Sequence, residues 1–91
     1  MNIYQQELFR KLRLLGCTGN YDEESGKLNV QYEGVLLCKQ DKNGFLTYDS
    51  RSFTPVMCEK LEEIKESAAA IREYTDIYII NKFVLFKLCL E

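Results

Sequence analysis

Histidine is absent from the 91 residues of this chain. Its absence removes the side chain that most often serves as a general base or a metal ligand. A nucleophile activated by histidine, of the Ser–His or Cys–His type, therefore cannot form within the chain. The sequence also has no Walker loop, dinucleotide-binding fingerprint or EF-hand loop. We expect a protein that is not an enzyme and holds no metal or cofactor.

Closely spaced cysteines are also lacking. The four cysteines are Cys17, Cys38, Cys58 and Cys89, and none belongs to a C-x-x-C pair. A structural zinc site draws its ligands in close pairs, so this spacing favours four free thiols in a reducing compartment. One alternative stays open on these residues: a thiol-dependent enzyme or sensor, which needs a cysteine with a lowered pKa.

Charge of one sign is not in excess, because 12 basic residues nearly balance 14 acidic ones and the net charge is −2. A protein that neutralises phosphates needs a clear positive excess, so a protein partner is favoured over a nucleic acid.

Long apolar runs are missing too. Ile77–Leu90 is the most apolar stretch and is shorter than the roughly 20 residues of a membrane helix. Met1–Phe9 lacks the pattern of a secretory signal, and we expect a cytoplasmic protein that does not enter the membrane.

Two segments have the periodicity of a helix that packs on one side. Asn2–Leu15 is the first, and Gly16 predicts its end. The second begins at Thr54-Pro55, a favourable cap followed by proline in the first helical position. Its apolar stripe, which we expect in the core, is Met57, Leu61, Ile64, Ala68 and Ile71.

The segment Cys17–Ser50 predicts an antiparallel β-meander, because alternating apolar residues are divided by turn signals. The turns are expected at Asp22–Gly26, Glu33-Gly34 and Asp41–Gly44. A two-residue hairpin turn at Glu33-Gly34 would pair Tyr32 with Val35 and Val30 with Leu37. The interior face of the sheet would then hold Leu28, Val30, Tyr32, Val35 and Leu37.

The last fifteen residues allow two interpretations. Their β-branched and aromatic residues favour a strand, whereas Ile77, Ile80, Val84 and Leu88 also fit one helix face. We predict a strand from about Lys82. The whole chain, residues 1–91, is then a single α+β domain: an antiparallel sheet of three to five strands packed against two helices, in the order α-β-β-β-β-α-(β).

Candidate binding residues come from clustered charge and from tyrosines near turns. They are Arg10, Lys11, Arg13, Tyr21, Asp22, Glu23, Glu24 and Tyr48. The three basic residues suit a phosphate or an acidic partner, and tyrosine is enriched in protein interfaces. The alternative for each is structural: a solvated helix end, a polar turn or ordinary half-buried packing.

Two segments, Tyr32-Glu33-Gly34-Val35-Leu36-Leu37 and Asn43-Gly44-Phe45-Leu46-Thr47-Tyr48, lie within this predicted helix, meander and charged-helix architecture. In these segments and in this architecture, the chain resembles small accessory proteins of bacterial conjugative elements and phages, some of them anti-CRISPR or antirestriction inhibitors. The resemblance implies a stoichiometric inhibitor of a nucleic-acid-targeting defence complex that works by occupying a surface. It carries over no functional residue.

We therefore predict a small non-enzymatic protein-binding module. The alternative is a nucleic-acid-binding accessory domain that uses the basic end of the first helix. Self-association is compatible with both, because Ile3 and Leu14 fall outside the main helical stripe and the C-terminal segment is apolar. A homodimer could bury these residues.

Overall fold

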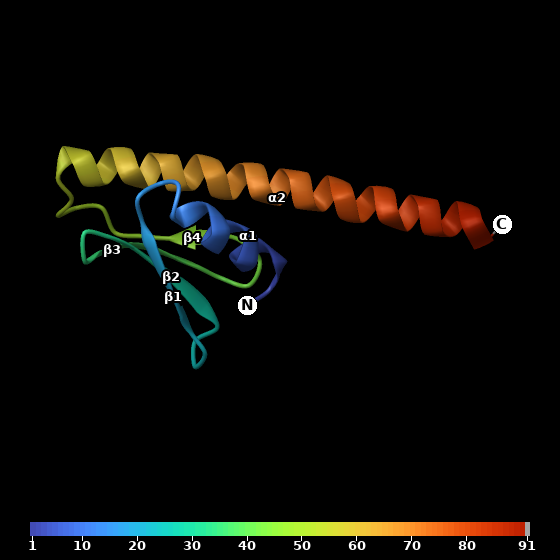
Figure 1. Cartoon of the computed structure of the whole chain (residues 1–91), viewed down its shortest axis with the longest axis horizontal. Coiled ribbons are helices and arrows are strands. Elements are labelled where there is room, and N and C mark those ends of the chain that lie inside the picture. The colour runs from blue at the N-terminus through green and yellow to red at the C-terminus, as the bar shows by residue number, and fades with distance from the viewer. Residues whose placement is uncertain (91) are drawn as a thin grey trace.

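The computed structural model describes the backbone of residues 1–90 and the side chains of residues 1–77. Its elements, in chain order, are α1 (Ile3–Leu12), β1 (Thr18–Asp22), β2 (Lys27–Tyr32), β3 (Val35–Gln40), β4 (Leu46–Thr47) and α2 (Pro55–Leu90). The four strands form one antiparallel sheet in the order β1-β2-β3-β4 (Figure 1). This confirms the predicted α+β arrangement and its meander.

Helix α1 begins at a capping box. The Asn2 side chain accepts a 3.1 Å hydrogen bond from the Gln5 backbone N–H, and the Gln5 side chain accepts one of 3.2 Å from the Asn2 N–H. These reciprocal bonds satisfy two of the donors that a helix start leaves free. The helix ends at Leu12, earlier than the expected Leu15. A tighter turn follows, in which the Gly16 N–H donates to the Arg13 carbonyl at 3.2 Å, and the Cys17 N–H then donates to the Leu12 carbonyl at 2.9 Å.

The β2–β3 hairpin differs from its predicted register. Tyr32 pairs with Val35 across the two-residue turn as expected, but Val30 pairs with Cys38 instead of Leu37. A β-bulge after Val30 causes the shift, because it places an extra residue on one strand. Leu37 and Cys38 are both buried, whereas Val35 is exposed and does not belong to the interior set.

One apolar core joins the sheet to both helices. Its buried members are Leu8 and Leu12 of α1, Leu28, Val30, Leu37 and Cys38 of the sheet, Leu61, Ile64 and Ile71 of α2, and Cys17. The predicted stripe of the second helix is therefore confirmed, with Met57 partly buried at its start and Thr75 buried beyond its end. Because all these side chains share one cluster, α1 and α2 cover the same face of the sheet.

Helix α2 begins at Pro55 as predicted, and the Thr54 hydroxyl accepts a 3.4 Å hydrogen bond from the Met57 N–H. The strand predicted from Lys82 is wrong, because the helix continues to Leu90. Strand propensity depends on pairing with a neighbouring strand, and a continuous helix supplies its own backbone hydrogen bonds. Its 36 residues give a length of about 54 Å, close to the longest dimension of 56 Å.

The C-terminal part of α2 runs past α1 and the sheet (Figure 1). Within the part of the chain that the structure describes, no helix has both the length and the apolar character needed to cross a membrane.

Candidate functional site

Helices α1 and α2 run antiparallel to each other. At one end, the Tyr4 hydroxyl donates a 2.7 Å hydrogen bond to Asp76 Oδ1. At the other end, Gly16 lies near the ammonium group of Lys60. The start of α1 therefore lies beside the middle of α2. Because α1 has 10 residues and α2 has 36, the C-terminal part of α2 extends beyond α1.

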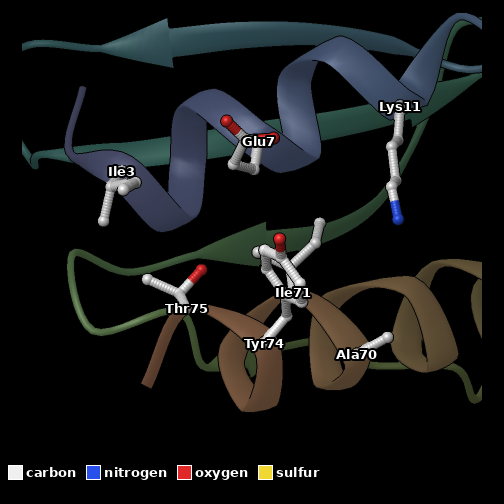
Figure 2. A pocket seen from close by; sticks show the side chains of 7 residues that line it. All are labelled: Ile3, Glu7, Lys11, Ala70, Ile71, Tyr74 and Thr75. Carbon is white, nitrogen blue, oxygen red and sulfur yellow. The ribbon is translucent and has the colours of Figure 1, made fainter. Parts of the chain in front are cut away.

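A groove with a volume of about 640 Å³ lies between the two helices. Figure 2 shows its two walls: Ile3, Glu7 and Lys11 on α1, and Ala70, Ile71, Tyr74 and Thr75 on α2. Residues spaced by four lie on one side of a helix, which explains why the α1 wall runs the length of that helix. This wall lies next to the Leu8 and Leu12 side that enters the core.

The open end of the groove is apolar. Ile3 is 45% exposed, Tyr74 is 75% exposed and Ile77, one turn further along α2, is 50% exposed. Ile71 and Thr75, by contrast, are buried, with an exposed fraction of 5% each, and border the core. Exposed apolar side chains that stand singly are ordinary, whereas these three lie close together where α2 extends past α1.

The predicted basic cluster lies in the last turn of α1 and directly after it. The Arg10 guanidinium forms a 3.0 Å ion pair with the Glu7 carboxylate on the same helix, and Arg13 is an exposed residue at the helix end. Lys11 lines the groove, where Figure 2 shows its side chain directed toward α2. Lys11 therefore faces α2, whereas Arg10 is paired with Glu7.

The candidates near turns lie elsewhere. The Asp22 carboxylate accepts hydrogen bonds from Ser25 Oγ at 2.9 Å and from the Glu24 N–H at 3.1 Å, and these bonds, chiefly the Ser25 bond, lower the pKa of Asp22. Glu23 and Glu24 are exposed in the same turn. The ring of Tyr21 packs against the core. This arrangement gives Asp22 a structural role in closing the β1–β2 hairpin.

Tyr48 follows β4, and its ring lies 5.1 Å from the ammonium nitrogen of Lys65 on α2. The eight predicted binding residues therefore occupy three places: the end of α1, the β1–β2 turn and the segment after β4. Of the eight, Lys11 alone lines the groove. Sequence analysis had one signal for the groove, since Ile3 is an apolar residue outside the main stripe of α1. It did not identify Glu7 or Ala70.

The face of the sheet opposite the helices carries exposed Leu36 and a band of polar residues. A row of paired residues crosses it from β1 to β4: Asn20, Asn29, Lys39 and Thr47. Sheets that bind single-stranded nucleic acids present aromatic rings on which bases stack. This row offers amides, one cation and one hydroxyl, which suits hydration more than stacking.

Among the side chains that the structure describes, no group of three histidine, cysteine, aspartate or glutamate residues could hold a metal ion. Cys17 and Cys38 are buried, and Cys58 is exposed on α2. No family model matches the chain, and no curated protein or solved structure shows significant similarity to it.

Proposed function

We propose that this chain is a non-enzymatic protein-binding module, and that it binds through the groove together with the part of α2 that extends beyond α1. We call this continuous area the groove–helix surface; its exposed described residues are Ile3, Lys11, Ala70, Tyr74 and Ile77. The observation that carries the proposal is that α2 continues from this apolar area to Leu90.

The composition of the extension supports a protein partner. Between residues 78 and 90 the sequence has charged side chains only at Lys82 and Lys87. A helix that is apolar around most of its circumference is stable in water when another surface covers it. Two antiparallel helices that border an open groove also present the geometry in which a further helix packs against both.

The nucleic-acid alternative receives less support. Arg10 is paired with Glu7, the open face of the sheet carries a polar row without stacking groups, and the chain has a net charge of −2. Binding to phosphates would need concentrated, unpaired positive charge. Inhibition of a nucleic-acid-targeting defence complex, which the sequence resemblance implies, stays a prediction within this proposal. Such an inhibitor acts by covering a surface of its partner, and it needs no catalytic activity.

A paired substitution tests the proposal. Tyr74→Glu puts a charge in the centre of the groove–helix surface, and Asn20→Glu puts the same charge on the open face of the sheet, at another exposed residue. Each tagged variant and the original chain would be used to capture proteins from a lysate, with quantification by mass spectrometry. We expect proteins that the original chain and Asn20→Glu retain and that Tyr74→Glu loses. Identical sets for all three chains, from a chain that also stays monomeric, would overturn the proposal.

A further inference from the structure

We propose that a second copy of this chain occupies the groove–helix surface, with the two α2 helices packed antiparallel about a two-fold axis near residue 79. The inference rests on the proposed function and names the partner of that surface.

The first argument is a heptad pattern on α2. Ala70, Tyr74, Ile77, Asn81, Val84 and Leu88 are separated by alternating steps of four and three. This alternation is the seam of a two-stranded coiled coil. It is distinct from the stripe that enters the core, whose last members are Ile71 and Thr75.

The seam begins in the groove and continues along the extension. Ala70 and Tyr74 line the groove and are exposed, and Ile77 is exposed just beyond it. The helical backbone from Pro55 to Leu90 is continuous, so the later heptad positions follow on the same side of α2. The groove and the extension therefore form one binding surface with a single helical repeat.

Charge sets the direction of pairing. Glu73 immediately precedes the seam position Tyr74, and Lys87 immediately precedes the seam position Leu88. The two residues thus occupy the same heptad position, two repeats apart, and positions of this kind face each other across an antiparallel pair. In a two-fold dimer each Glu73 meets the other copy's Lys87, which gives two opposite-charge contacts.

A parallel dimer would not create these contacts. Residues 73 and 87 are 14 positions apart, which separates them by about 21 Å along the helix axis. In the antiparallel pair, Tyr74 lies opposite the second copy's Val84 and Ala70 lies opposite its Leu88. The last turns of each helix then lie in the other copy's groove beside α1. Asn81 falls within one turn of the axis in both copies, where a polar seam residue fixes the register.

Exchange of the two charges is the decisive experiment. Sedimentation equilibrium would measure the dissociation constant of the original chain, of Glu73→Lys, of Lys87→Glu and of an equimolar mixture of the two variants. Each variant alone should weaken the dimer about tenfold or more, because both attractive contacts become repulsive. The mixture should restore the original affinity, because each heterodimer regains two opposite-charge contacts.

Two results would overturn the inference. One is a chain that stays monomeric from micromolar to millimolar concentration. The other is a dimer whose affinity in the mixture is no better than in the separate variants. Both charged positions lie outside the core stripe, and circular dichroism of each variant would verify that it folds. Asn20→Glu, with its added charge on the open sheet face, should leave the dissociation constant unchanged.

Cross-linking tests the direction separately. In a Cys58→Ser/Cys89→Ser background, Ala70→Cys and Leu88→Cys would be prepared as two single variants. An antiparallel dimer predicts a disulfide between the two variants when they are mixed and oxidised, whereas a parallel dimer predicts disulfides within each variant alone. A disulfide only within each variant would overturn the antiparallel pairing.

The failure of this inference is distinguishable from the failure of the proposed function. If the chain is monomeric and Tyr74→Glu still abolishes capture of a different protein, the homodimer is wrong and the protein-binding function stands. If the chain is monomeric and Tyr74→Glu changes nothing that is captured, both proposals are wrong.

Discussion

The Tyr4 hydroxyl donates a hydrogen bond of 2.7 Å to Asp76 Oδ1, across 72 positions of the sequence. This bond fixes the start of α1 to α2 at the level where α2 leaves the body. The acceptor carboxylate also raises the pKa of Tyr4 above its ordinary value of 10.0, since ionisation of the hydroxyl would remove the donated proton and place two negative charges together.

The pH dependence of stability follows from this shift. A pKa that is higher in the folded than in the unfolded state means that the bond stabilises the fold below pH 10.0, and that this contribution is lost as the pH rises through the folded pKa. We expect Tyr4→Phe to lower the urea midpoint at pH 7 and to have a smaller effect at pH 11. Tyr21→Phe, at a ring outside the groove–helix surface, is the control. An equal effect of Tyr4→Phe at both pH values would contradict the role of the hydrogen bond.

The Gln5 amide is a second connection between α1 and the sheet. It is 1% exposed, and its Nε2 donates to the Gly26 carbonyl at 2.8 Å and to the Gln40 carbonyl at 3.1 Å. Gln5→Leu keeps the volume but leaves these carbonyls without that donor, at an expected cost of about 1–3 kcal/mol. Gln6→Leu is the control, because Gln6 is exposed and its substitution should change stability by less than about 0.5 kcal/mol. Urea denaturation would compare them, and equal losses would refute the prediction.

Gln5 also shows where sequence reasoning stops. Local signals identified most of the fold: the stripe Leu61–Ile71 repeats with helical period, and Glu33-Gly34 has the composition of a hairpin turn. Both depend on residues close together in the sequence. A buried glutamine on a helix depends on carbonyls 21 and 35 positions away, which no local pattern reveals.

The errors have the same origin. The bulge after Val30 decides whether Leu37 or Cys38 faces it, and this choice depends on how both side chains pack against the helices. At Lys82 the local sequence favours neither strand nor helix clearly, so the choice between them depends on the tertiary surroundings. For the groove, the sequence showed that Ile3 lies outside the stripe of α1. It could not show that Tyr74 lies across from it, because that distance is set by the packing of α1 on α2.

Alanine substitutions at two glycines would distinguish the stability cost of backbone strain from that of steric crowding. Gly34 and Gly44 both have positive φ, at 80° and 88°. A Cβ at Gly34 would meet nothing within 4 Å, whereas one at Gly44 would lie 2.8 Å from Arg72 Cγ and 3.2 Å from Tyr4 Cβ. Gly34→Ala should therefore show only the cost of the left-handed backbone, about 1–2 kcal/mol. Gly44→Ala should cost more, because it also moves Arg72, which lies 3.7 Å from the centre of the Phe45 ring.

Thermal and urea unfolding of the two alanine variants would measure the difference. Since the two φ angles are similar, the excess loss for Gly44→Ala reports the crowding between the β3–β4 turn and α2. A Gly44→Ala variant as stable as Gly34→Ala would show that the side chain of Arg72 moves aside without cost, and would contradict a close fit between this turn and the two helices.

The thiols give the last prediction, which also addresses the thiol-enzyme hypothesis. Cys38 is 1% exposed, and burial raises its pKa from the ordinary 9.0 to about 12. Burial likewise raises the pKa of Cys17. Because the thiolate is the reactive form, both residues should react with iodoacetamide at pH 8 at least about a hundredfold more slowly than exposed Cys58, and all three should react in urea. Peptide mass spectrometry would measure the rates.

The raised pKa also predicts how the fold responds to base. The neutral thiol of Cys38 is favoured in the folded state, so its contribution to stability is present below pH 9.0 and is lost as the pH rises toward the folded value of about 12. Cys38→Ala should therefore make the fall in stability between pH 9 and pH 11 shallower, even though the smaller side chain lowers stability at pH 7. Rapid alkylation of Cys38 in the folded chain at pH 8 would contradict its protection by burial and would favour a reactive thiol.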